Sequence, residues 1–151
     1  MLIDYKNINV SDLNARCKNT MVEFMELYFT EVGPDFLKAE MKVTAKTVQP
    51  LRMLNGGASL AIAESVGSMA ANLCLDRSKF VALGLDINGN HTKGVEEGNM
   101  VYATAKPHHI GKTTQVWEIK ITNAADELVH ISRLTMAVVP IPEGKQDMLK
   151  V

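Results

Sequence analysis

Apolar and polar residues alternate along several stretches of the chain, which is the pattern of β-strands buried on one face. In residues 36–43, the apolar side chains of Leu37, Ala39 and Met41 alternate with lysine and glutamate. Residues 27–32 just before are rich in β-forming residues, and a Gly-Pro-Asp turn separates the two segments. The pattern therefore predicts a β-hairpin near the start of the chain.

Alternation returns in the second half of the chain and predicts about four more strands. The segments are residues 80–92 with Val81, Leu83, Leu85 and Ile87 on one face, residues 99–107 with Val101, Ala103 and Ala105, a strand with Trp117, Ile119 and Ile121, and residues 128–139. The stretch from Asn123 to Asp126 is predicted to join the last two strands as a hairpin loop.

Two segments have helical spacing instead. Residues 11–25 predict a short helix that Ser11 caps. Residues 57–75 are rich in alanine, contain no proline and place apolar residues on nearly every face, which predicts a helix buried most of the way round. Its small side chains keep this helix thin, so a sheet could wrap closely around it.

The order of elements is a hairpin, one buried helix and then a meander of about four strands. A single helix packed on one face of an antiparallel sheet indicates an α+β fold. The sequence shows no repeat, low-complexity tract or flexible linker, so we expect a single domain over residues 1–151, with a flexible tail from about residue 140.

Composition and charge narrow the functional classes. The chain has 151 residues, and its Lys+Arg count of 16 against an Asp+Glu count of 17 gives a formal charge of −1, which argues against nucleic acid or an anionic membrane as a partner. The N-terminus lacks the pattern of an export signal and no apolar run has the length of a membrane span. Cys17 and Cys74 provide neither a disulfide framework nor metal-ligand spacing. We therefore expect a cytoplasmic protein that needs no metal and no cofactor.

Glu64 is the strongest single candidate for chemistry. It is the only charged residue between Gly57 and Leu75, and an ionised carboxylate in such an apolar helix is costly unless it is hydrogen-bonded or functional. Ser68 follows one helical turn later on the same face. A structural interpretation is equally open: Glu64 lies on a hydrated stripe of the helix or pairs with a basic residue across an interface.

The motif Asn55-Gly56-Gly57 immediately before the helix is the second candidate. Paired glycines let a ligand approach the backbone, and the free N–H groups at a helix start stabilise an anion or a developing oxyanion. A Gly-Gly pair more often marks a tight turn. Glu64 lies roughly 12 Å further along the helix, from its rise per residue. One small substrate could therefore touch both features if a neighbouring subunit supplied one of them.

The segment Lys106–Lys112 is the third candidate, because it places two lysines and two histidines around a Pro/Gly turn. His91 and Lys93 add charge of the same sign, and such a loop suits phosphate groups. The structural alternative is a solvated loop between two strands.

With these residues in place, the sequence resembles the hotdog-fold acyl-CoA thioesterases, most closely the branch that contains 1,4-dihydroxy-2-naphthoyl-CoA thioesterase and other aroyl-CoA hydrolases. The matching stretches include TVQPLRMLNGGASLAIAESVGSMA (47–70), VALGLDINGNHTKGVEEG (81–98), AKPHHIGKTTQVWEIKI (105–121) and SRLTMAV (132–138). The resemblance implies a long helix wrapped by a curved antiparallel sheet. It also implies a homodimer, usually paired into a homotetramer, with active sites at the subunit interface.

The resemblance also implies roles for individual residues. Glu64 would be the catalytic carboxylate, attacking the thioester or activating water, and the Gly56 N–H would polarise the thioester carbonyl. Gln49 would position water or the carboxylate, and Ser68 would border the acyl pocket. The coenzyme A arm and nucleotide would be held by Gly84, His91, Lys93, His109, Gly111, Lys112 and Thr113. The implied reaction is hydrolysis of acyl-CoA or aroyl-CoA, with 1,4-dihydroxy-2-naphthoyl-CoA of menaquinone synthesis as one candidate substrate.

The chain departs from the family at Asn55, where the family usually has histidine. Asparagine donates and accepts hydrogen bonds but does not titrate near neutral pH. Asn55 would substitute if the histidine only orients the thioester, and the rate would fall if its charge matters. Two other interpretations stay open: a non-catalytic hotdog module that binds acyl-CoA or a protein partner, and a hydratase, although no Asp/His pair stands at the helix start.

Overall fold

The computed structural model describes residues 3 and 5–142, so most of the tail predicted to be flexible from about residue 140 lies outside the described residues. The elements, in chain order, are a 3-10 helix (Tyr5–Asn7), α1 (Val10–Arg16), α2 (Met21–Phe24), β1 (Leu27–Val32), β2 (Leu37–Lys42), α3 (Gly56–Leu73), β3 (Phe80–His91), β4 (Met100–Ile110), β5 (Thr114–Asn123) and β6 (Leu128–Pro140).

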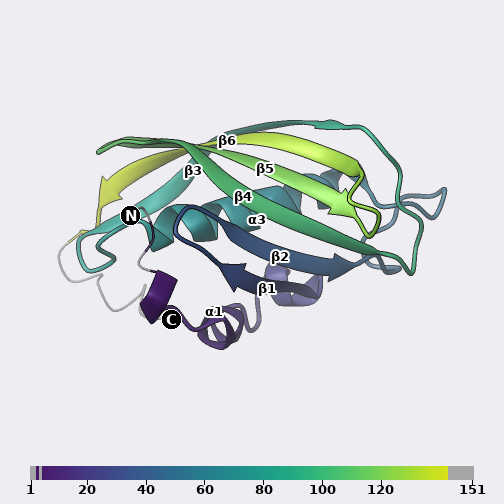
Figure 1. Ribbon diagram of the computed structural model, residues 1–151, viewed down its shortest axis with the longest axis horizontal. Coiled ribbons are helices and arrows are strands. Elements are labelled where there is room, and N and C mark those ends of the chain that lie inside the picture. The colour runs from purple at the N-terminus through teal and green to yellow at the C-terminus, as the bar shows by residue number, and fades with distance from the viewer. Residues whose placement is uncertain (1–2, 4, 143–151) are drawn as a thin grey trace.

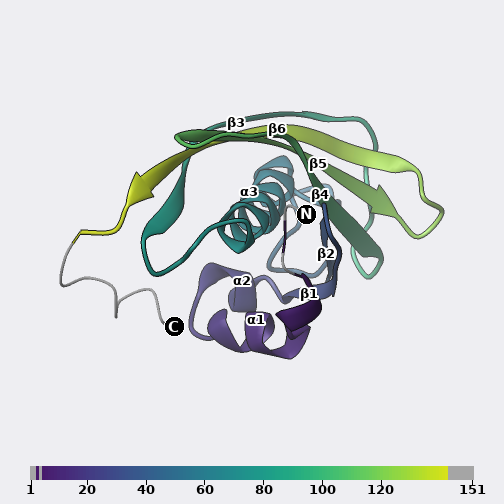
Figure 2. The ribbon, with the colours of Figure 1, turned by 60° about the vertical axis from the view of Figure 1, so that its left-hand side comes forward.

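The six strands form one antiparallel sheet in the order β1-β2-β4-β5-β6-β3 (Figure 1). Figure 2 shows this sheet curving around α3, with α1 and α2 on the opposite side of the helix from the β3–β6 part of the sheet. The arrangement confirms the α+β class and the hotdog architecture that the resemblance implies.

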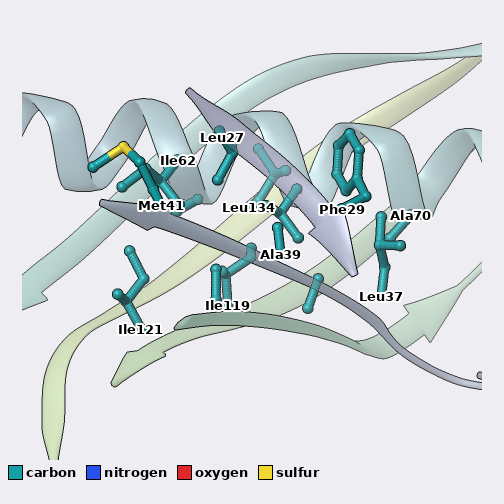
Figure 3. Close-up of a cluster of buried hydrophobic side chains, with 14 of the residues drawn as sticks. Leu27, Phe29, Leu37, Ala39, Met41, Ile62, Ala70, Ile119, Ile121 and Leu134 are labelled. Carbon is teal, nitrogen blue, oxygen red and sulfur yellow. The ribbon is translucent and has the colours of Figure 1, made fainter. Parts of the chain in front are cut away.

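The core lies between α3 and the concave face of the sheet. Ile62, Val66 and Ala70 of α3 are fully buried, and they face an inner sheet surface that includes Ile119 and Leu134 (Figure 3). Each large aliphatic side chain buried here contributes about 1.5–3 kcal/mol through removal from water. The alanines of α3 let the helix approach the sheet closely, as the sequence predicts. No helix among the described residues is long and apolar enough to cross a membrane.

The predicted helix over residues 11–25 is wrong in its extent and its cap. The helix ends after Arg16, because Asn19 takes a left-handed backbone with φ 58°, and a separate turn of helix begins at Met21. The N-cap is Asn9, whose side chain accepts a hydrogen bond from the Ser11 backbone N–H. Ser11 is therefore the residue being capped and not the cap.

The predicted meander is also wrong for its first strand. β4, β5 and β6 are sequential neighbours, whereas β3 pairs with β6 at the far edge of the sheet and β2 pairs with β4. β2 occupies the edge of β4 at which a meander would place β3, so β3 pairs with the free edge of β6.

The predicted buried face of β3 is wrong as well. Leu83 and Leu85 are 53% and 65% exposed, whereas Ala82 is buried against α3. A β-bulge between Gly84 and Asp86 shifts the pairing with β6, so that Ile87 returns to the inner face. Period-2 alternation across a bulge misplaces the faces, because the extra residue reverses the order of inward and outward side chains.

Candidate active site

The start of α3 exposes a backbone donor. Asn55 is the N-cap, and its side-chain oxygen accepts the Gly57 N–H at 2.7 Å while its carbonyl accepts the Ser59 N–H at 3.0 Å. Within the part of the chain that the structure describes, the Gly56 N–H has no acceptor. It is an unpaired donor at the positive end of the helix dipole, where an anionic oxygen is stabilised.

A pocket of about 380 Å³ lies in front of this helix start. Gln49, Gly56, His91 and Lys93 all line it, so the structure brings four of the candidate residues together. They come from three parts of the chain: the loop before α3, the first residue of α3, and the end of β3 with the residues that follow it. Residues that are far apart in the sequence therefore lie close together around the start of α3.

Gln49 is fixed by the turn in which it lies. Its backbone N–H donates to Met53 O at 2.8 Å, its carbonyl accepts the Arg52 N–H at 2.9 Å, and its side-chain oxygen accepts the Leu51 N–H. Because that oxygen serves the turn, the side-chain N–H groups are the donors that Gln49 has left for a ligand in the pocket.

His91 and Lys93 line the pocket together with Gly56. A Cβ placed on Gly56 would be 2.8 Å from His91 Nε2, so glycine at the helix start makes room for the imidazole. Lys93 Nζ is 2.6 Å from Glu127 Oε1. This ion pair, together with a hydrogen bond from Asn123, holds the pKa of Glu127 below its ordinary value. A phosphate bound by Lys93 would therefore compete with an existing carboxylate partner.

Behind His91 lie two residues that the sequence analysis missed, His130 and Ser132 of β6. His130 Nδ1 is 3.0 Å from His91 Nδ1, and its Nε2 contacts Ser132 Oγ. Burial and, to a smaller degree, the neighbouring His91 lower the pKa of His130 to about 4. A signal was present: His130 and Ser132 are polar residues on the face of β6 that continues with the buried Leu134 and Met136.

Glu64 lies in the middle of α3 and is half-buried. Ser68 Oγ donates a hydrogen bond to Glu64 Oε1 at 3.2 Å, which places both residues on one face of the helix, as their spacing predicts. A Cβ on Gly84 of β3 would collide with the same carboxylate oxygen. Because Gly84 has no side chain, the Glu64 carboxylate can lie against the backbone of β3.

The remaining basic residues lie at the other end of the sheet. The segment Lys106–Lys112, expected to be a loop, belongs to β4 as far as Ile110, with a bulge between Pro107 and His109. The turn itself is short and contains Gly111, Lys112 and Thr113. His91 pairs with His130 of β6, whereas the turn abuts Ala137, about 23 Å away along that strand. Within one chain the two basic groups are thus far apart.

Other chemistries find little support among the described residues. Burial raises the pKa of both cysteine thiols, that of Cys74 to about 11, so neither is a reactive thiolate at neutral pH. No group of three His, Cys, Asp or Glu side chains within residues 3 and 5–142 could hold a metal ion. The pocket offers a backbone donor, an amide and an imidazole, and neither Glu64 nor Ser68 is among the residues that line it.

Comparison with known proteins gives the family. Residues 51–130 match the thioesterase superfamily. A relative from Vibrio cholerae, VC_A0580, is described only as an esterase and is 47% identical over 138 residues, which are 91% of this chain and 91% of that protein. The 1,4-dihydroxy-2-naphthoyl-CoA hydrolase of Escherichia coli is 41% identical over 133 residues, 88% of this chain and 96% of that protein. The crystal structure of a mutant of thioesterase PA1618 from Pseudomonas aeruginosa aligns with a TM-score of 0.89 and 38% identity, covering 93% of this chain and 100% of that one.

Proposed function

Because the chain belongs to the thioesterase superfamily, we propose that it hydrolyses acyl-CoA or aroyl-CoA thioesters to the free acid and coenzyme A. The observation that supports this most is the unpaired Gly56 N–H, which faces a pocket also lined by Gln49. Thioester hydrolysis needs charge stabilisation on the carbonyl oxygen and an activated oxygen nucleophile. Gly56 supplies the first and Glu64 the second.

In the proposed reaction, the thioester carbonyl oxygen accepts the Gly56 N–H and gains negative charge as the carbonyl carbon is attacked. The attacking oxygen belongs either to Glu64 or to a water whose proton Glu64 removes, and the carbon–sulfur bond breaks to release the coenzyme A thiolate, which takes up a proton. Attack by water gives the free acid directly. Attack by Glu64 gives an acyl anhydride, which a water molecule then hydrolyses to the free acid and the regenerated carboxylate. Gln49 orients the attacking group through its side-chain N–H, and Asn55 keeps the helix start in place as its cap. Ser68 borders the acyl group and holds the carboxylate through its hydrogen bond.

The site requires two copies of the chain. Glu64 lies eight positions after Gly56, about 12 Å along the helix axis, which is too far for both to act on one carbonyl carbon. β3 is an edge strand of 12 residues with Leu83 and Leu85 exposed, and such an edge pairs readily with another strand. We propose a homodimer joined along β3, in which Gly56 of one copy faces Glu64 of the other. Two dimers then form a homotetramer, as the family resemblance implies.

A second copy would also bring together the two basic groups that lie far apart within one chain, His91 with Lys93 and the turn that contains Lys112. Across a dimer interface, Gly84, His91 and Lys93 of one copy and His109, Gly111, Lys112 and Thr113 of the other would line one path for coenzyme A. The lysines would bind its phosphates and the glycines would leave room for the pantetheine arm.

The acyl group is proposed from one relative. The Escherichia coli relative is named for 1,4-dihydroxy-2-naphthoyl-CoA, and at 41% identity it makes that compound, an intermediate of menaquinone synthesis, the first substrate to try. We place the reaction in the cytoplasm, in keeping with the two unpaired cysteines.

The test follows free-thiol release from a panel of acyl-CoA and aroyl-CoA thioesters that includes 1,4-dihydroxy-2-naphthoyl-CoA. Glu64→Gln is expected to lower kcat by about 10²–10⁴-fold, the size of a lost acid–base group. Glu40→Gln on β2 is a matched control, because Glu40 is also half-buried but lies on the face of β2 opposite to the buried Ala39 and Met41. Equal turnover by wild type and Glu64→Gln would contradict the role of Glu64. Coenzyme A binding by calorimetry with no turnover of any thioester would favour the non-catalytic module, for which Asn55 is the motivating residue.

A further inference from the structure

Three polar side chains lead from the buried face of β6 to the pocket at the start of α3. Ser132 Oγ contacts His130 Nε2, and His130 Nδ1 lies 3.0 Å from His91 Nδ1. The two imidazole rings have centroids 4.7 Å apart and planes inclined by 31°. Ser132 and His130 are 3% and 0% exposed, whereas His91 lines the pocket. The His91 ring is thus held from behind by two buried side chains.

Hydrogen-bond satisfaction fixes the protons along this series. Ser132 Oγ has no other partner among the described residues, so its hydroxyl proton is satisfied only if it points at His130 Nε2. His130 Nε2 is then the acceptor, and a neutral His130 carries its proton on Nδ1. That proton is donated to His91 Nδ1, which leaves the proton of a neutral His91 on Nε2. The opposite direction would bury the serine hydroxyl proton without an acceptor.

We propose that Ser132 and His130 fix His91 in the tautomer with its proton on Nε2, so that His91 provides a second hydrogen-bond donor beside the Gly56 N–H for the thioester oxygen. The contact between His91 Nε2 and the position of a Cβ on Gly56, 2.8 Å, puts this N–H against the helix start. The inference rests on the proposed thioester hydrolysis. It makes His91 a catalytic residue beyond its expected contact with coenzyme A, and it makes His130 and Ser132 positioning residues.

The low pKa of His130 supports this arrangement, because a protonated His130 would carry N–H on both ring nitrogens and could not accept from Ser132. A neutral His130 also adds no charge behind the pocket, so His91 is oriented by hydrogen bonding alone.

The first test reads the tautomer directly, without substrate. Ring ¹⁵N shifts of histidine-labelled protein at pH 7.5 are expected to show His91 protonated on Nε2 in the wild type, with assignment by loss of the signal in His91→Ala. Ser132→Ala removes only one oxygen atom, and it is expected to shift the His91 population toward the Nδ1-protonated form. His108→Gln serves as the control, because His108 lies on β4 and its Nε2 contacts Glu118 at 3.6 Å, which is not a member of the series.

The second test measures thioester hydrolysis on the same proteins. His91→Ala is expected to lower kcat by about 10²-fold, as loss of one oxyanion donor does. Ser132→Ala is expected to lower kcat by about tenfold with KM within twofold, since it disturbs the donor without removing it, and Ser132→Thr is expected to restore most of the rate. Thermal melting establishes that each variant is folded.

Two results would overturn the inference: a wild-type His91 protonated on Nδ1, or a folded Ser132→Ala with unchanged His91 shifts and unchanged kcat. Failure of the proposed function looks different. Suppose that the wild type hydrolysed no thioester while the His91 tautomer still depended on Ser132. The hydrogen bonds from Ser132 through His130 to His91 would then be confirmed, and only their role in thioester hydrolysis would be wrong.

Discussion

The two edges of the sheet differ: the β1 edge is covered by a side chain of α1, whereas the β3 edge is exposed. At the β1 edge, the side chain of Asn14 from α1 donates to Phe29 O at 2.9 Å and accepts the Phe29 N–H at 2.8 Å, so it occupies the place of a neighbouring strand. At the β3 edge, Leu83 and Leu85 stand exposed on a strand of 12 residues. A blocked edge prevents pairing and an open one invites it.

The difference extends to the chemistry. β3 carries Gly84 against Glu64 and His91 against Gly56, whereas the candidate residues include none from β1. The exposed edge of the sheet is therefore the one whose residues contact both Gly56 and Glu64. The β1 edge serves the fold of a single chain, and this contrast leads to four predictions.

The largest effect is expected from closing the β3 edge. Leu83→Asp with Leu85→Asp places carboxylates where two copies would pair, and analytical ultracentrifugation should show a monomer. Activity should fall by at least about 10³-fold, more than the loss of a single donor, because each site then lacks the partner's carboxylate. Tyr28→Asp is the control on β1, since Tyr28 is 53% exposed on the blocked edge and its variant should keep the wild-type mass. A fully active monomer would show that one chain completes the site.

The second-largest effect is expected from acid, which should lower the free energy of unfolding through His130, the residue that pairs with His91 of β3. His130 has a pKa of about 4 in the folded protein against 6.5 as its ordinary value, so between these pH values the unfolded chain binds the extra proton. Stability is therefore highest above pH 6.5 and falls as pH drops toward 4, by about 3 kcal/mol in all. Urea unfolding at a series of pH values measures this. Between pH 4 and 6.5, the free energy of unfolding of His130→Gln should depend less on pH than that of the wild type, whereas His108→Gln should behave like the wild type. If His130→Gln lost stability with falling pH as steeply as the wild type does, His130 would not be the group responsible.

Gly84→Ala tests the part of β3 that faces the carboxylate. The added methyl group would collide with Glu64 Oε1, so the carboxylate must move. A displacement of about 1 Å should lower kcat by about 10²-fold. The oligomeric state should match that of the wild type, because the added methyl group points at Glu64 of the same chain. If kcat stayed at the wild-type value, the position of Glu64 against β3 would be irrelevant to catalysis.

The smallest effect is expected at the blocked edge. Asn14→Ala removes both hydrogen bonds to Phe29 and leaves that backbone to water, which should cost about 1–2 kcal/mol in the free energy of unfolding. Thioester hydrolysis per folded molecule should be unchanged. Denaturant unfolding and kcat are measured on one preparation, and Asn14→Asp, which retains an acceptor for the Phe29 N–H, should recover part of the loss. A fall in kcat greater than in stability would give the β1 edge a role in function.

The sequence alone determined the hairpin, the thin buried helix and the alternating inner faces of β4 and β5, because these patterns are local and regular. It also singled out Glu64 and Gly56, since a charge in an apolar helix and a Gly-Gly helix start are visible without a fold, whereas Gln49 came only from the family resemblance. The residue pair Glu64 and Ser68 met as predicted because helical spacing fixes it.

Tertiary structure decided what depends on which strands become neighbours. The bulge after Gly84 reversed the faces of β3, and β2 took the edge of β4, so that β3 lies at the far edge beside β6. The pairing of β3 with β6 brought His130 and Ser132 behind His91. The spacing of residues along the sequence predicts how far apart two side chains lie within one helix or one strand. Which side chains meet between elements is set by strand order and register, and these are settled only when the whole core packs.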